Sequence, residues 1–331
     1  LTAFKQQLLQ SACHRNTLEP NTALIDVSDP RLSALIQAHN AHIVINTCGP
    51  FQNAPYTVAK ACLVAGAHYI DLADARDFVT NITSLADDAE KSRLYVISGA
   101  STVPTLSAAV IDAYRDPFDQ IDDLQYGISP GQKTPRGLAT AQAVLSYIGQ
   151  PIAGTNGGYG WQQLYLQHYP SIRSRLMGLC DVPDYDLFKP RYGMTKMTFS
   201  AGMESKSLHL AIWLSSWLVR LKIIRNLSNY ANFLRRLSHC FDPLGSQDGG
   251  MHLTIRGKDL KGQPLERTWY IEAFDGDGPM IPCIPAIILT HKILKKELDQ
   301  PTAMPCIGLI TLTEYLDALT KENVNHRTSL E

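Results

Sequence analysis

The strand expected over residues 42–48 ends in the side chains best suited to bind a ligand. Asn46-Thr47-Cys48-Gly49-Pro50-Phe51 places an amide, a hydroxyl and a thiol beside a glycine and a rigid proline. Sheets of parallel strands covered by helices bind their ligands beyond the carboxyl ends of the strands. Gly49 would let backbone approach such a ligand closely, and Pro50 and Phe51 would form a stiff apolar wall for a flat ring. An ordinary strand-to-helix turn has the same pattern, so both interpretations stay open.

Two other apolar runs also end in polar residues. Asp26-Val27 stands where an adenine ring can lie in such sheets, although Ser28 or Asp29 could instead simply cap the next helix. Ser98-Gly99-Ala100-Ser101 contains Gly-x-Ser, but Val103 replaces the second glycine that a nucleophile elbow needs. We therefore expect no serine triad and interpret Ser98 and Gly99 as part of a loop close to a cofactor.

Tyr69 and Asp71 lie inside the apolar run 68–73. A carboxylate buried without a partner is costly, so Asp71 should be paired or should lie at the mouth of a cleft. Burial would shift its pKa and would suit it, together with Tyr69, to proton transfer. The alternative is a structural carboxylate that accepts hydrogen bonds from backbone amides.

The elements that must position these residues alternate along the first part of the chain. Apolar, strand-like runs occur at 23–27, 42–48, 68–73 and 94–98, and helix-like segments at 2–13, 31–39, 55–65 and 78–92. This alternation predicts a parallel sheet of βαβ units with helices on both faces.

After residue 105 the alternation stops, and we expect a second region of α+β type with a mixed or antiparallel sheet. Its expected elements are a helix at 106–114, a strand at 124–128, a hairpin with arms at 251–256 and 267–273, and a helix at 285–297. A strand at 306–311 and a helix at 313–321, capped by Thr313, should follow. The terminal Leu330-Glu331 resembles a cloning remnant and is set aside.

Bulk composition excludes some classes of protein. The chain has 331 residues, of which 45% are hydrophobic and 18% charged, with a formal net charge of −1. A nucleic-acid binder needs a basic excess, so we expect no nucleic-acid partner. The seven cysteines form no Cys-x-x-Cys pair and the histidines show no metal-ligand spacing, so no metal site is predicted. Reduced thiols favour a cytoplasmic location.

One segment departs from the average composition. Residues 206–241 carry six basic residues and no acidic one, and residues 206–229 also hold Trp213 and Trp217. A basic helix with two tryptophans could lie at a membrane surface, which would make the protein peripheral to a membrane. The alternative is a core or interface helix. The stretch between charged residues is too short to span a bilayer, which needs about 20 apolar residues.

Several of these pieces resemble the saccharopine dehydrogenase family, in its broader branch of saccharopine dehydrogenase-like oxidoreductases. The resemblance is carried by Asp26-Val27-Ser28-Asp29, Val44-Ile45-Asn46-Thr47-Cys48-Gly49-Pro50-Phe51, Ala61-Cys62, Gly66-Ala67-His68-Tyr69-Ile70-Asp71-Leu72 and Ser98-Gly99-Ala100-Ser101. Weaker matches are Gly278-Pro279 through Pro282, and Cys306-Ile307-Gly308-Leu309 before Glu314-Tyr315.

The resemblance implies an α/β fold with a Rossmann-type domain that binds NADP or NAD and a second α+β domain that closes over the cleft. It places the first domain at residues 1–105 and a substrate or dimerisation domain at 106–300, with a strand and helix at 301–329 returning to the first. It implies hydride transfer to or from a C=N, C=O or activated C=C bond of a small or lipid-like substrate. Asp26, Val27, Asn46, Thr47, Cys48, Gly49, Pro50, Phe51, Ser98 and Gly99 would then border the cofactor, and Tyr69 and Asp71 would handle protons.

The chain departs from this family at its start. Members begin with a strand and a glycine-rich turn that seats the pyrophosphate at a helix N-terminus, and no Gly-x-Gly-x-x-Gly occurs here. We therefore expect an incomplete Rossmann-type sheet that lacks its first strands, as in a piece of a longer protein. This piece should bind little or no dinucleotide.

Two other functions stay open. The fold could serve a non-catalytic binding protein that contacts a membrane through residues 206–229. The second domain could mainly form a homodimer, with the segment 251–273 pairing strands across a two-fold axis.

Overall fold

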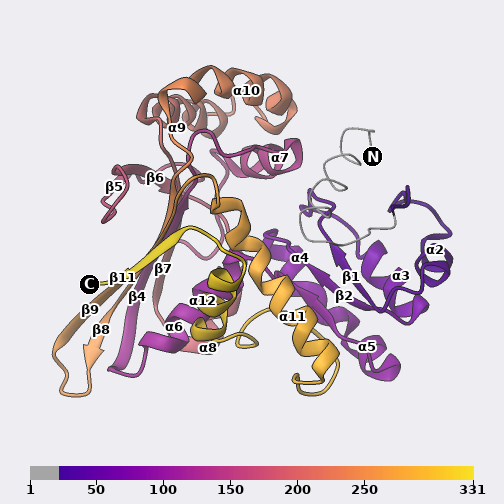
Figure 1. Ribbon diagram of the computed structural model, residues 1–331. Coiled ribbons are helices and arrows are strands. Elements are labelled where there is room, and N and C mark those ends of the chain that lie inside the picture. The colour runs from indigo at the N-terminus through magenta and orange to yellow at the C-terminus, as the bar shows by residue number, and fades with distance from the viewer. Residues whose placement is uncertain (1–21) are drawn as a thin grey trace.

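A computed structural model describes residues 22–331, so the helix expected over 2–13 lies outside the described residues. Two sheets organise the described chain, and Figure 1 shows them side by side with helices between and around them. The first, sheet A, has the strand order β1-β2-β3-β10, and the second, sheet B, has the order β11-β9-β8-β4-β7-β6-β5.

Sheet A is parallel throughout, as the alternation of strands and helices predicts. Its strands are β1 (Ile43–Asn46), β2 (His68–Asp71), β3 (Val96–Ser98) and β10 (Ala303–Pro305). Helix α2 (Leu32–Ala38) precedes β1, and α3 (Thr57–Ala65) joins β1 to β2. The connection from β2 to β3 is broken into α4 (Arg76–Thr80), the 3₁₀ turn η1 (Asn81–Leu85) and α5 (Ala86–Ser92).

The strand expected over residues 23–27 is absent, and this prediction is wrong. The segment is irregular, and Leu24 is 77% exposed. Asp26 accepts hydrogen bonds on Oδ1 from the backbone N–H (2.8 Å) and hydroxyl (2.7 Å) of Ser28, which turns the chain locally. An apolar run becomes a strand only when a neighbouring strand pairs with it, and no strand among residues 22–331 pairs with this one.

Sheet A gains its fourth strand from the far end of the chain, but not from the predicted residues. The strand was expected at 306–311, whereas β10 pairs with β3 through residues 303–305. The ladder ends where the Cys306 N–H donates to the Ser98 carbonyl (2.8 Å), and Gly308 then turns the chain with φ +70°. The following helix α12 (Leu312–Lys321) is capped by Thr311 and not by Thr313, since Thr311 and Glu314 form a reciprocal capping box.

Sheet B is mixed, since β4 (Phe118–Ser129) pairs in parallel with β7 (Lys196–Met203) while the other pairs are antiparallel. The predicted hairpin is confirmed as β8 (Gly249–Asp259) and β9 (Pro264–Ala273). The hairpin lies inside the sheet, between β4 and β11 (His326–Leu330). Its remaining members are β6 (Arg175–Leu179) and β5 (Tyr165–Gln167). Leu330, set aside above, pairs with Trp269.

The helices of the second region fall into two groups in Figure 1. One group lies between the two sheets: α6 (Ser107–Tyr114), preceded by the π-helical turn η2 (Thr102–Leu106), α8 (Asp184–Tyr192), α11 (Ile284–Lys295), preceded by the 3₁₀ turn η5 (Gly278–Cys283), and α12. The other group lies at one end of sheet B: α7 (Leu138–Tyr147), α9 (Lys206–Arg220) and α10 (Ala231–Ser238), the last with the short turns η3 (Ser228–Tyr230) and η4 (His239–Leu244) beside it.

One apolar core joins the two sheets. It runs from Ile70 and Ile97 of sheet A through Leu106 and the helices between the sheets to Leu124 and Leu253 of sheet B. Burial at the heart of this core raises the pKa of Asp184 to about 7, even though Ser107 and Tyr126 each donate a hydrogen bond of 2.7 Å to its Oδ2. The two regions therefore fold around shared contacts.

The buried His209 of α9 should make the stability of the fold depend on pH. It is fully buried, its ring packs at a tilt of 47° against Trp161 with centroids 4.9 Å apart, and burial lowers its pKa to about 4. Between pH 6.5 and 4 this histidine is protonated in the unfolded chain but neutral in the folded chain. Acidification over this window therefore lowers the free energy of unfolding by up to about 3 kcal/mol. His209→Phe should remove that part of the pH dependence, which urea unfolding at several pH values would measure. An unchanged pH profile in the variant would contradict the assignment.

Candidate functional site

The carboxyl ends of β1 and β2 lie side by side, as the alternating pattern predicts. Asn46 is level with Asp71 in the parallel register of the two strands. The turn at residues 47–51 therefore leaves the sheet next to Leu72, the residue that follows β2. In a parallel sheet this is the edge at which ligands bind.

A cleft opens at this edge, and we call it the strand-end cleft. Its volume is about 180 Å3. One wall comes from the turn after β1 and from the residues after β2, and the other wall from α7 of the second region. The lining residues are Thr47, Gly49, Pro50, Phe51, Gln52, Leu72, Asp74, Ala139, Thr140 and Ala143. The two regions of the chain thus meet across this cleft.

A second hollow of about 200 Å3 lies on the other side of the same turn. Val27 lines it together with Asn46, Cys48 and Tyr69, and Phe51 lines both cavities. The turn thus forms a partition between two spaces. Of the twelve residues singled out from sequence, eight line one or both of these spaces: Val27, Asn46, Thr47, Cys48, Gly49, Pro50, Phe51 and Tyr69.

The turn is held by its own first residue and by aromatic packing. Asn46 is buried, accepts a hydrogen bond from the Cys48 N–H (3.0 Å) and donates one to the Tyr69 hydroxyl (3.0 Å). The Phe51 ring packs against Phe78 with centroids 5.1 Å apart. At Gly49 a Cβ would meet nothing nearer than the Phe51 ring at 3.6 Å, so the space beside this glycine is open. Backbone can therefore come close to a ligand here.

Asp71 does not line the strand-end cleft, since its side chain is fully buried beneath it. Its Oδ1 accepts hydrogen bonds from the Ala73 N–H (3.0 Å), the Ser98 hydroxyl (2.9 Å) and the Gly99 N–H (2.8 Å). Burial raises the pKa of Asp71, and these bonds only partly oppose the shift. The hydrogen bonds tie the end of β2 to the end of β3.

Ser98 and Gly99 belong to this junction and line neither cavity. Gly99 has φ +79°, and a Cβ there would lie 2.9 Å from both Pro104 and Val79, so only glycine fits. Asp26 is exposed, and its carboxylate accepts the two hydrogen bonds from Ser28. The structure therefore assigns Ser98 and Gly99 a role in shaping the sheet end.

Two substitutions at Asp71 distinguish the role of its hydrogen-bond acceptor from the role of its negative charge. Asp71→Ala leaves two backbone N–H groups and a hydroxyl buried without acceptors, and it should cost about 3 kcal/mol or more of folding free energy. Asp71→Asn keeps an oxygen acceptor and is neutral, so it should cost less than about 1 kcal/mol. Urea unfolding of the two variants measures both values. Equal losses in the two variants would contradict the anchoring role.

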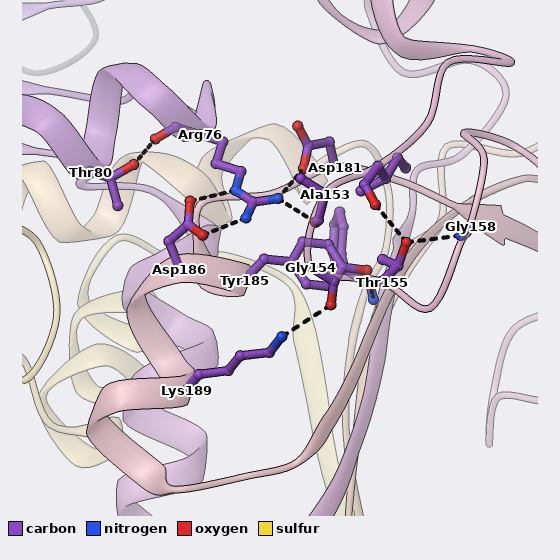
Figure 2. Close-up of polar contacts among 12 residues, drawn as sticks. Arg76, Thr80, Ala153, Gly154, Thr155, Gly158, Asp181, Tyr185, Asp186 and Lys189 are labelled. Carbon is purple, nitrogen blue, oxygen red and sulfur yellow. Dashed lines mark hydrogen bonds and ion pairs between the residues drawn. The ribbon is translucent and has the colours of Figure 1, made fainter.

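One residue that no sequence pattern singled out joins the first and second regions of the chain. Arg76, at the start of α4, reaches into the second region, as Figure 2 shows. Its guanidinium makes a two-pronged ion pair with Asp186 of α8, reaches Asp181 at 3.3 Å and donates to the Ala153 carbonyl at 2.6 Å. It also lies over the Tyr185 ring, 5.4 Å from the centroid. These partners are 77–110 positions away in sequence, so no local pattern could have revealed them.

The clamp around Arg76 predicts a graded loss of stability. Arg76→Ala leaves two carboxylates and a carbonyl without their shared donor and should cost about 2–3 kcal/mol. Arg76→Lys keeps the charge but loses the planar guanidinium, so its stability should lie between that of Arg76→Ala and that of the natural chain. The control is Arg31→Ala, because the Arg31–Asp29 pair lies at the surface, where water and salt screen it, and its loss should change stability little. Thermal unfolding compares the three, and similar losses for Arg31→Ala and Arg76→Ala would contradict the clamp.

Within residues 22–331 no group of three or more His, Cys, Asp or Glu side chains is arranged to hold a metal ion. The polar groups that face the strand-end cleft are instead Thr47, Gln52, Asp74 and Thr140. Such a site can bind and orient a small polar or aromatic group.

Comparison with known proteins supports the fold and leaves the family open. No family model and no curated protein matches the chain. Among solved structures, apo saccharopine dehydrogenase (L-Glu forming) from Saccharomyces cerevisiae covers 97% of this chain and 91% of its own, with TM-score 0.63 and 11% identity. An oxidoreductase from Sinorhizobium meliloti covers 97% and 89%, with TM-score 0.37 and 11% identity. The likeness to saccharopine dehydrogenase shows that the chain has a Rossmann-like fold with a second domain.

Proposed function

We propose that this chain belongs to an NAD(P)-dependent oxidoreductase of the saccharopine dehydrogenase type. The observation that carries the proposal is the strand-end cleft, which lies at the carboxyl ends of β1 and β2 and is closed by α7. Dinucleotide-binding sheets place their ligand at this edge. The fold shared with a dehydrogenase along almost the whole chain supports the same assignment.

The described residues fit one end of such a cofactor. A volume of about 180 Å3 is smaller than the ~300–1,000 Å3 of typical ligand pockets and suits a single ring. Pro50 and Phe51 supply an apolar wall, and the open space beside Gly49 permits close approach. The sequence has no Gly-x-Gly-x-x-Gly turn to hold a pyrophosphate. The fit is thus to the nicotinamide end alone.

When bound, the cofactor would supply the hydride chemistry, and the chain would supply position and environment. Thr47 and Gln52 would offer polar groups to a carboxamide, while Pro50 and Phe51 would exclude water from one face of the ring. The bond reduced or oxidised would be C=N, C=O or an activated C=C of a small or lipid-like substrate. Val27, Asn46 and Cys48 would border the hollow on the other side of the turn.

Proton handling by Tyr69 and Asp71 stays a prediction. Tyr69 lines the second hollow, and its pKa is raised by burial and then by the charge of Asp71. Asp71 lies beneath the cleft and makes the hydrogen bonds of an anchor. If Asp71→Asn folds normally and still lowers turnover in the complete enzyme, the carboxyl acts on protons. Unchanged turnover would leave it an anchor.

The proposal is tested with half of the cofactor. In saturation-transfer NMR, reduced nicotinamide mononucleotide should bind weakly to the chain, since the ring needs no pyrophosphate site. Ala143→Trp should abolish the signal because it fills the cleft. The matched control is Leu138→Trp on the same helix, whose side chain is exposed and outside the cleft lining.

Two results would contradict the proposal. One is the absence of any nicotinamide signal in the natural chain, and the other is equal signals in the two tryptophan variants. A separate titration addresses the phosphate end of the cofactor. NADPH or NADH should bind residues 1–331 with a dissociation constant far above the micromolar range. Micromolar affinity would refute the expectation that the chain cannot hold the pyrophosphate.

A further inference from the structure

Helix α9 carries apolar side chains on two opposite faces. The inner face packs Leu208, His209, Ser216 and Val219 against the protein, where all four are buried. The outer face presents a second row that solvent reaches. This row consists of Leu210, Leu214, Trp217 and Leu218, which are 36–59% exposed, followed by Leu221 at 65%. The spacing i, i+4, i+7, i+8, i+11 places these side chains on one side of a helix.

The exposed row extends past the end of the helix. Ile223 is 67% exposed in the turn after α9, between the exposed basic residues Lys222 and Arg225. Further large side chains are exposed at Tyr230, the last residue of η3, and at Phe233 and Leu237 of α10, each 46% exposed or more. Figure 1 shows α9 and α10 together at the end of sheet B, away from β1 and β2. Monomeric proteins seldom expose this many large apolar side chains on neighbouring elements without using them.

The charge around this surface has one sign. The segment 206–241 contains six basic residues and no acidic one. The acids that flank it are already paired: Glu204 faces Arg175 at 3.8 Å, and Asp242 pairs with Arg136 and with His239. Two copies of the chain meeting through this surface would bring like charges together, which disfavours a symmetric dimer here.

A hollow of about 380 Å3 adjoins the exposed row at Trp217. Arg220 lines it with its guanidinium 4.0 Å from the Tyr159 ring centroid and 4.9 Å from that of Trp217, and it donates to the Gln162 side chain at 2.7 Å. A cation held between aromatic rings beside the exposed row suits a phospholipid, whose phosphate group would meet Arg220 while its hydrocarbon tail lies along the row.

The geometry points to a peripheral contact between this surface and a membrane that contains anionic lipids. Helix α9 lies in the plane of the interface, with Leu210, Leu214 and Leu218 among the acyl chains and the basic side chains at the phosphates. No helix among residues 22–331 is long and apolar enough to cross a bilayer. The contact is independent of the strand-end cleft, so it holds whether or not the proposed oxidoreductase activity does.

Vesicle sedimentation tests the electrostatic part of the contact. The chain should sediment with phosphatidylcholine vesicles that contain phosphatidylserine and much less with phosphatidylcholine alone, and salt should weaken the binding. The double variant Lys222→Gln with Arg225→Gln should partition about 30-fold less, since each lost cation removes roughly a factor of five. The matched control, Lys258→Gln with Lys261→Gln, removes the same charge from exposed positions at the tip of the β8–β9 hairpin and should bind normally.

A second pair of variants tests the apolar row. Leu214→Asn with Leu221→Asn should lose vesicle binding, whereas Leu260→Asn with Leu294→Asn, which alters two exposed leucines elsewhere, should keep it. Brominated lipids should quench the fluorescence of Trp213 and Trp217 alone, because Trp161 and Trp269 are buried. The double variant Trp213→Phe with Trp217→Phe should therefore show no quenching. Circular dichroism confirms that each variant folds.

Three outcomes overturn the proposal. The first is no sedimentation of the natural chain with anionic vesicles. The second is equal binding by the α9 variants and their controls. The third is a natural chain that self-associates through this surface, so that the leucine variant converts an oligomer to a monomer without any change in vesicle binding.

Discussion

The guanidinium of Arg76 is the interaction on which the candidate site most depends. The cleft has one wall on sheet A and the other on α7, so its width follows from how the two regions are held. Arg76 crosses between them with a side chain only 11% exposed, where an ion pair with a planar fork is strongly directional. The continuous core between the sheets sets the overall distance, and this clamp sets the local orientation.

A second constraint acts within sheet A. Asp71 accepts hydrogen bonds from three separate residues and so joins the carboxyl ends of β2 and β3 beneath the cleft. Gly99 has to be glycine because its φ is +79° and a Cβ there would lie 2.9 Å from both Pro104 and Val79. The residues that form the floor of the site are therefore different from those that would touch a ligand, although both groups stand at strand ends.

Local pattern was a good guide where one short segment carried the whole signal. The runs that became β1, β2 and β3, the hairpin of β8 and β9, and the turn at 47–51 could all be predicted. It failed at 23–27 and 306–311, because an apolar run does not reveal whether a partner strand exists or where the ladder stops. It also missed Thr311 as the helix cap, which only the reciprocal bonds with Glu314 distinguish from Thr313.

The sequence by itself determined the alternation of strands and helices, and hence that Asn46 and Asp71 would stand at one edge of a parallel sheet. Only the tertiary structure decided that Asp71 is buried, that α7 closes the cleft and that Arg76 joins the two regions of the chain. Periodicity is a property of neighbouring residues and survives in any arrangement of the elements. Contacts across 70 or more positions depend on how those elements pack, which no local pattern records.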